Sequence, residues 1–225
     1  MSESTGESCA DKGVGRRLFL QRTVAGATLG SMALLAGAQP VAAKQRHHHH
    51  HHVDRHRFTA LFQSIQTHEN AHVEYLVSAL GRAARPKPTF QHLTQHHFED
   101  FLLLAQTFEN TGVSAYLGAA PVIFSRDILA AAGSIATMEA RHAGAVNVGL
   151  GDPVSPNNAS FDAPLSPDDV ARAVSPFFVS LNGGPPVHYD PTTPSPDNDI
   201  QILNFALALE YLEAEFYNLN ANFYQ

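Results

Sequence analysis

The sequence predicts an all-α protein, an antiparallel four-helix bundle, and three observations support this prediction. Apolar residues recur every three or four positions in four long segments, as in helices that bury one face. Each segment carries a glutamate within its apolar stripe. A Pro-rich stretch long enough to cross a bundle separates the third segment from the fourth. The predicted helices cover residues 58–80, 98–118, 127–147 and 200–219.

The first helix combines an apolar stripe with one carboxylate and one imidazole. Phe62, Ile65 and Leu76 share a face with Glu69 and His72. A carboxylate among apolar side chains is unfavourable unless it is paired or binds a cation. Glu-x-x-His spacing places both groups on one side of a helix, where they can share a metal ion. Alone, this pair is a weak signal, because solvated histidines are common on helix faces.

The second and third helices carry polar residues in the same register. The second has Glu109, with Tyr116 seven residues later, and the third repeats the Glu-x-x-His pair with Glu139 and His142. A pair that recurs at the same place in another apolar stripe is harder to explain as polar residues tolerated at a helix edge. The repetition therefore favours metal binding.

The last helix is apolar over a wide arc and is predicted to be buried between neighbours. It carries Glu210, with Tyr217 seven residues later, and a second acidic residue, Glu213. Glu213 falls in the position where two other helices have histidine. We expect it either to bind metal as a seventh ligand or to pair with a cation such as Arg141, and we assign it a supporting role.

Two helices with Glu-x-x-His and two with a single glutamate form the ligand set of a di-iron or di-manganese carboxylate bundle. Tyr116 and Tyr217 are expected either to hydrogen-bond ligand carboxylates or to pack in the core. Glutamate and histidine suit both metals, so the predicted cofactor is two iron ions or two manganese ions. The predicted ligands are Glu69, His72, Glu109, Glu139, His142 and Glu210.

The first 43 residues have the features of a twin-arginine export signal. Arg16 and Arg17 begin an R-R-L-F-L sequence, an apolar run covers residues 23–36, and small residues follow at 41–43. The run is too short and too rich in glycine and alanine for a membrane anchor. We expect cleavage of residues 1–43, a periplasmic or extracellular location, and no membrane span in the cleaved protein.

Charge and cysteine content limit the partners. The net charge of −7 argues against nucleic acid. The one cysteine, Cys9, lies in the export signal, so any metal must be held by glutamate and histidine. Residues 44–57 include six consecutive histidines, His47 to His52, which are either a purification tag or a natural metal-scavenging segment; their regularity favours the tag.

The predicted domain, residues 58–225, contains two long connections. Residues 82–97 read as a loop with two prolines and solvated histidines at 92, 96 and 97. Residues 148–199 read as a linker that crosses the bundle, in which only 166–178 looks helical, with Ser166 as its N-cap.

Four segments resemble the ferritin-like domain of exported bacterial proteins, a family related to desiccation-associated proteins and more distantly to ferritins, bacterioferritins and rubrerythrins. The resemblance implies a four-helix bundle with a dinuclear metal centre and places the same six residues as ligands. In the family, the helix matching Glu210 comes first, whereas here it comes last. This predicts a permuted helix order and allows the last helix to be exchanged within a homo-oligomer. The segments are QTHENAHVEYLVSALG (66–81), FENTGVSAYLGAAP (108–121), ATMEARHAGAVN (136–147) and ILNFALALEYLEAEFYN (202–218).

Two functions from different classes follow from these features. The first is an exported metal-binding protein whose iron or manganese pair oxidises iron or handles dioxygen or peroxide. The alternative is a non-catalytic stress- or desiccation-associated structural protein in which metal is incidental or absent. The complete six-residue ligand set favours the first. A storage cage is a third option, but the sequence shows none of the extra elements that a shell requires.

Overall fold

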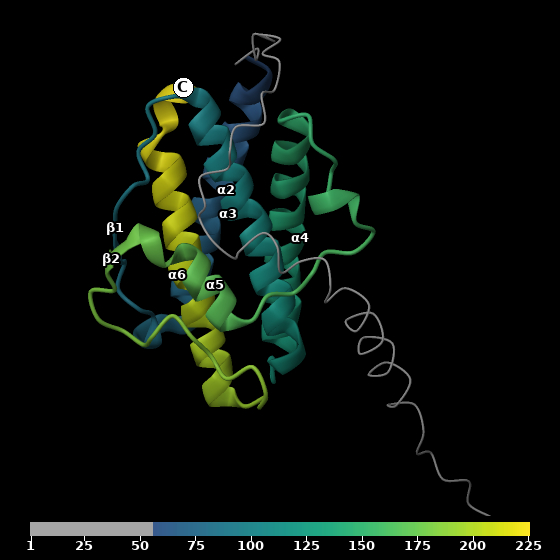
Figure 1. Ribbon diagram of the computed structural model, residues 1–225. Coiled ribbons are helices and arrows are strands. Elements are labelled where there is room, and N and C mark those ends of the chain that lie inside the picture. The colour runs from purple at the N-terminus through teal and green to yellow at the C-terminus, as the bar shows by residue number, and fades with distance from the viewer. Residues whose placement is uncertain (1–55) are drawn as a thin grey trace, which may run out of the picture. The chain divides into compact units, whose positions relative to one another are not determined.

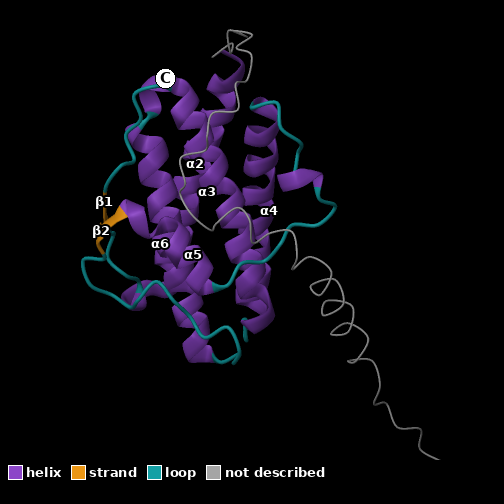
Figure 2. Cartoon of the chain, in the orientation of Figure 1, coloured by secondary structure: helices purple, strands orange, loops and turns teal. Residues whose placement is uncertain are grey.

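The computed structural model describes residues 56–225, and the export-signal and histidine-run predictions lie outside this range. The described chain is mainly helical, which confirms the all-α prediction, and four long helices lie side by side (Figures 1 and 2). The last of them begins four residues earlier than predicted, because Ser195 caps it by accepting a hydrogen bond from Asn198 N. The helices are α2 (His56–Leu80), α3 (Phe98–Ala119), α4 (Arg126–Gly149) and α6 (Pro196–Leu219).

Neighbouring helices run antiparallel. Near the start of α2, Gln63 Nε2 donates to Tyr224 O, whereas beyond the end of α2, Arg85 N donates to Asn204 Oδ1 in the first half of α6. Helix α3 packs in the same antiparallel way on α4. Helices α2 and α3 both have their N-terminal ends in one aromatic cluster, so they run parallel. Parallel helices need a connection that returns along the bundle, and residues 81–97 therefore form a crossover that the sequence identified only as a loop.

Short elements brace the two crossovers. Strand β1 (Thr89–Phe90) pairs antiparallel with β2 (Phe178–Ser180), and neither was predicted, because two or three residues are too few to show a period. The helix predicted at 166–178 ends earlier. Helix α5 (Pro167–Val174) gives way to a 3₁₀ turn, Ser175–Phe177, because Pro176 has no backbone N–H with which to continue the α-helical hydrogen bonds. The other 3₁₀ turns are Gly81–Ala83, Ala120–Val122, Pro156–Asn158 and Ala221–Phe223.

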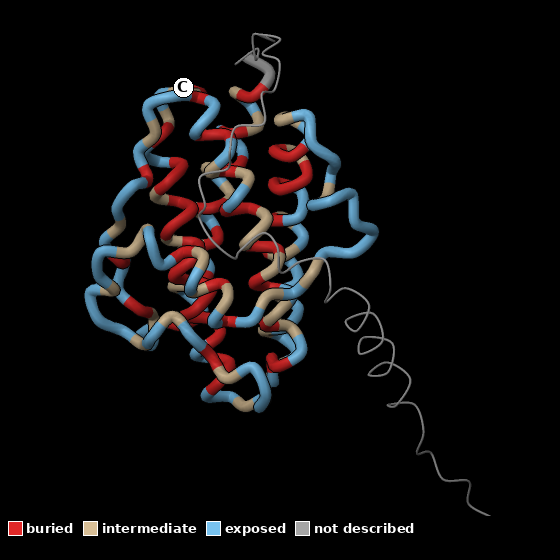
Figure 3. The backbone as a smooth tube through the Cα atoms, viewed as in Figure 1, coloured by how far each residue is buried: buried red, intermediate tan, exposed pale blue. Residues whose placement is uncertain are grey.

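Buried positions follow the inward faces of the four long helices (Figure 3). At one end of the bundle the core is aromatic. The Phe62 ring meets the Phe101 ring edge-on at 4.8 Å, and the Phe101 ring stacks on Phe216 at 5.1 Å. All three side chains are fully buried. This aromatic layer lies about two helical turns from the middle of α2 and α3 and excludes water from that side of the bundle centre.

Candidate metal centre

The six predicted ligands meet in the middle of the bundle. Helices α2 and α4 each contribute a Glu-x-x-His pair, and α3 and α6 each contribute one glutamate. All six are buried, and the most accessible, His72, is only 9% exposed. The side chains that sequence register placed on separate core stripes therefore lie in one polar cluster surrounded by apolar packing.

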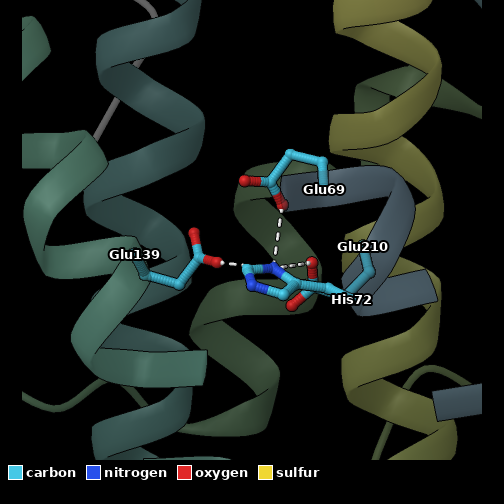
Figure 4. A group of neighbouring side chains, drawn as sticks. All are labelled: Glu69, His72, Glu139 and Glu210. Carbon is cyan, nitrogen blue, oxygen red and sulfur yellow. Dashed lines mark hydrogen bonds and ion pairs between the residues drawn. The ribbon is translucent and has the colours of Figure 1, made fainter. Parts of the chain in front are cut away.

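Three carboxylates surround one nitrogen of His72 (Figure 4). Its Nδ1 lies 3.3 Å from Glu69 Oε2, 3.2 Å from Glu139 Oε1 and 3.2 Å from Glu210 Oε2. A single N–H can point at only one of these oxygens. The arrangement therefore supplies more acceptors than the imidazole can satisfy, as expected for ligands arranged around a cation.

His142 has a similar environment on the other side of the cluster. Its Nδ1 lies 2.9 Å from Glu69 Oε1 and 3.3 Å from Glu109 Oε2. Two ligand atoms bound about 2.1 Å from one cation lie roughly 3 Å apart when they subtend a right angle at it. The spacings around both histidines are therefore compatible with atoms that share a metal ion.

The cluster divides into two overlapping sets of four residues whose ligand atoms lie within 4.8 Å of one another. Both sets contain Glu69 and Glu139. We call the set completed by His72 and Glu210 the His72 position, and the set completed by His142 and Glu109 the His142 position. Shared carboxylates are what two adjacent cations need as bridges.

Several polar atoms of the cluster lack the hydrogen bonds that buried polar atoms normally make. Within the described part of the chain, several of its buried polar atoms have no hydrogen-bond partner, and such atoms are costly in an apolar interior. His142 Nδ1 is close to two carboxylates and still makes no hydrogen bond, which indicates that these groups are directed at a common point between them. The residues thus form a site that could hold metal ions. The unsatisfied atoms are Glu69 Oε1, Glu109 Oε2, Glu139 Oε1 and Oε2, His142 Nδ1 and Glu213 Oε2.

Without metal, protons take the place of cations. Burial opposes the charged imidazole, but the close carboxylates of Glu139, Glu210 and Glu69 outweigh it and raise the pKa of His72 to about 12. For His142, the close carboxylates of Glu109 and Glu69 likewise outweigh burial and raise its pKa to about 9. Burial raises the pKa of Glu69 to about 7 and that of Glu139 well above its ordinary value. Any metal ion that binds here must displace these protons.

Two tyrosines hydrogen-bond the terminal carboxylates in a crossed arrangement. Tyr116 on α3 donates to Glu210 Oε1 on α6 at 2.6 Å, and Tyr217 on α6 donates to Glu109 Oε1 on α3 at 2.5 Å. In each glutamate the second oxygen faces a histidine. Of the two roles that the sequence left open for these tyrosines, the structure shows hydrogen bonding to the carboxylates of two predicted ligands, which fixes the orientation of each glutamate.

Glu213 is buried at the same centre without a cation partner. The expected pairing with Arg141 is wrong, because Arg141 is exposed and donates to Thr137 O and Met138 Sδ on its own helix. Burial, followed by the charges of nearby glutamates, raises the pKa of Glu213 well above its ordinary value. Its carboxylate belongs to neither four-residue set.

Gly112 on α3 makes room for this extra carboxylate. A Cβ atom at Gly112 would lie 3.1 Å from Glu139 Oε2 and 3.3 Å from Glu213 Oε1. Both distances are tighter than ordinary van der Waals contact, so any larger residue would press on two carboxylates. Glycine at this position allows α6 to place Glu213 against the cluster.

Sequence reasoning missed one residue beside the centre. His68 Nδ1 lies 3.0 Å from His142 Nε2, and the two nearly parallel rings meet edge to edge, with their centroids 5.2 Å apart and an angle of 10° between their planes. The signal was present, because His68 directly precedes Glu69 and lies one helical turn before His72. The loop histidines at 92, 96 and 97 are exposed, and neither four-residue set includes them.

A helical bundle with a buried carboxylate and histidine cluster defines a class of protein whose core can hold metal ions. Comparison with family profiles gives the family: the ferritin-like domain matches residues 31–152 and 198–225, well over half of the chain. The chain therefore belongs to the ferritin-like domain family. Searches of curated proteins and of solved structures found no match.

The family match contains α2, α3 and α4, all but the first two residues of α6, and all six predicted ligands. Residues 153–197, which lie between its two blocks, include α5 and β2. The permuted helix order stays a prediction, as does the binding of metal by these six residues. Within residues 56–225, no helix has the length and apolar character needed to cross a membrane.

Proposed function

We propose that this chain binds two first-row transition metal ions, iron or manganese, as a dinuclear centre. The observation that carries the proposal is the pair of overlapping ligand sets with Glu69 and Glu139 in common. In this assignment the shared glutamates would hold both ions. Glu210 and His72 would complete one position, and Glu109 and His142 would complete the other.

Charge balance supports two divalent ions. Four carboxylates and two neutral imidazoles carry the negative charge that two divalent cations neutralise, and a buried site is stable only when its charges are nearly balanced. Glutamate oxygens and imidazole nitrogens are ligands that suit both iron and manganese. The predicted mixture of donors is therefore consistent with either metal.

We propose iron oxidation, or the handling of dioxygen or peroxide, as the chemistry of this centre. A bound pair of such ions supplies two electrons in concert. The residues of this chain contribute positioning and the exclusion of water. Tyr116 and Tyr217 orient the terminal glutamates, and the aromatic layer around Phe101 shields the centre from one side.

Metal analysis tests the binding proposal. The chain, purified after growth with iron or with manganese, should contain about two ions per molecule, the number that the two ligand sets define. Glu139→Gln, which neutralises a shared ligand, should lose both. The matched control is Glu74→Gln on the exposed face of α2, which should keep both ions.

The opposite result supports the structural alternative. A wild-type chain that purifies without metal and takes up neither ion on titration overturns the dinuclear proposal. In that case the non-catalytic stress or desiccation protein becomes the better assignment. An optical spectrum recorded after iron and air are added distinguishes oxidation from simple binding.

We also propose export by the twin-arginine route to the periplasm or beyond the cell, on the basis of Arg16 and Arg17. Replacing both with lysine should retain the protein inside the cell, as cell fractionation would show. Exchange of α6 between chains of a homo-oligomer is a separate prediction. In the described chain α6 packs on its own α2, so the ligand set is complete without exchange.

A further inference from the structure

The two histidines of the centre differ at their outer nitrogens. His142 uses both nitrogens: Nδ1 faces Glu69 and Glu109, whereas Nε2 lies 3.0 Å from His68 Nδ1. His72 directs Nδ1 at three carboxylates, and within residues 58–225 its Nε2 has no hydrogen-bond partner. The His142 position is therefore supported by a side chain that the His72 position lacks.

The internal repeat of the bundle shows where this difference originates. Helices α2 and α4 both carry Glu-x-x-His, and the residue before the glutamate is His68 on α2 but Met138 on α4. The Met138 thioether accepts from Arg141 at the surface of its own helix. The two positions are equivalent in the repeat. His68 lies beside His142, whereas Met138 makes no corresponding hydrogen bond to His72.

We propose that His68 is a positioning residue that holds His142 in the tautomer able to bind metal. A neutral imidazole carries one N–H and one lone pair. When His142 donates its Nε2–H to His68 Nδ1, the lone pair is left on Nδ1, which points into the ligand set. This inference rests on the proposed dinuclear centre and deepens it, because it makes the two positions unequal.

The same contact restricts rotation of the His142 ring. The His68 and His142 rings are nearly parallel and meet edge to edge at these two nitrogens, so rotation of His142 about its Cβ–Cγ bond would break the hydrogen bond. Loss of such an outer partner typically costs about 10- to 100-fold in metal affinity. The His142 position should accordingly fill first when metal is limiting.

Cobalt(II) titration of the full chain, followed by its visible absorption, tests the inference one position at a time. In a Glu210→Gln background, which disables the His72 position, adding His68→Leu should weaken binding about 10- to 100-fold. Adding His68→Gln should restore affinity to within about threefold, because the amide oxygen accepts the same hydrogen bond. Met138→Leu is the matched control and should change nothing.

A second background tests whether His68 acts only on the His142 position. With Glu109→Gln disabling the His142 position, His68→Leu should leave cobalt affinity and the spectrum unchanged. Thermal unfolding of each metal-free variant separates loss of folding from loss of binding, and the half-buried position of His68 favours tolerance of the change.

Three results would overturn the inference alone. The first is that His68→Leu leaves cobalt affinity unchanged in the Glu210→Gln background. The second is that His68→Leu weakens binding equally in both backgrounds. The third is that His68→Gln alone loses one bound ion, which would make His68 a ligand. A wild-type chain that takes up no cobalt, iron or manganese overturns the proposed function and this inference with it.

Discussion

Tyr116 on α3 donates a 2.6 Å hydrogen bond to Oε1 of Glu210 on α6. The tyrosine and the glutamate come from different helices, so the contact fixes the relative height of α3 and α6 while it orients a ligand. Tyr217 and Glu109 repeat the contact in the opposite direction. The bundle therefore has an approximate internal two-fold relation centred on the candidate metal site.

Tyr116→Phe should weaken the His72 position and spare the His142 position. The change removes the hydrogen bond that orients Glu210, and the loss of such an outer partner lowers metal affinity about tenfold or more. Stepwise cobalt or manganese titration would measure it. Tyr75→Phe, on the exposed face of α2, is the control, and equal weakening by both variants would contradict the assignment.

The metal-free protein should lose stability as pH rises. The pKa of Glu69 is about 7 in the folded state against 4.5 ordinarily, and that of His142 is about 9 against 6.5. Between each pair of values the folded state holds a proton that the unfolded chain has released, so stability falls as pH rises through that window. Each 1 kcal/mol of stability lost in this way lowers the unfolding temperature of a domain of this size by roughly 2–4 °C.

Thermal unfolding from pH 5 to pH 9, with and without metal, is the measurement. With saturating metal the trend should reverse, because binding requires deprotonated ligands and so tightens as pH rises. The metal-free decline should be smaller in His142→Gln. A metal-free protein that becomes more stable towards pH 9 would show that protons do not occupy the cluster as described.

Gly112→Ala should separate stability from metal binding. Alanine favours the helix by up to about 1 kcal/mol over glycine, but its Cβ would press on the ends of Glu139 and Glu213. Because both contacts are with the ends of flexible side chains, we expect unchanged or slightly raised stability of the metal-free protein and weaker metal binding.

Gly133→Ala on α4 is the matched control for this substitution. A Cβ at Gly133 meets no atom within 4 Å, so the variant should gain helix stability and bind metal normally. Identical metal affinities for the two alanine variants would show that Gly112 has no role in shaping the centre.

Glu213→Gln and Glu210→Gln should have different effects. Glu210 Oε2 lies 3.2 Å from His72 Nδ1 and belongs to the same ligand set, so Glu210→Gln should remove one ion. Glu213 belongs to neither ligand set, so Glu213→Gln should keep both ions. It should also stabilise the metal-free protein, because it removes a buried carboxyl group that must take up a proton on folding. Loss of metal in Glu213→Gln, with retention in Glu210→Gln, would reverse the assignment within α6.

The long helices and the convergence of the six polar residues could be predicted because both depend on local register. A glutamate that repeats the spacing of core residues must point into the core, whatever the path of the loops. Contacts between helices could not be predicted in this way. His68 acquires its role only because α4 places His142 beside it, and the sequence of α2 does not contain that information.

The Arg141 prediction failed for a reason that the helix itself supplies. Arg141 follows Glu139 by two residues, about 200° around the helix, so it must face away from the side that carries the ligands. The crossover at 81–97 was missed for a different reason. Its length is compatible with a simple turn or with a return along the bundle, and only the parallel packing of α2 and α3 decides between them.

The aromatic end of the bundle also brings together the two ends of the described fold. Phe58, near the start of α2, and Phe223, near the end of the chain, both contact the ring of Phe98. A short covalent link from Gln225 to His56 would close the backbone into a ring. The ring could then be cut in the connection between α4 and α6, which would make α6 the first helix. Every predicted ligand would keep its neighbours, so the geometry of the centre does not depend on which helix comes first in the chain.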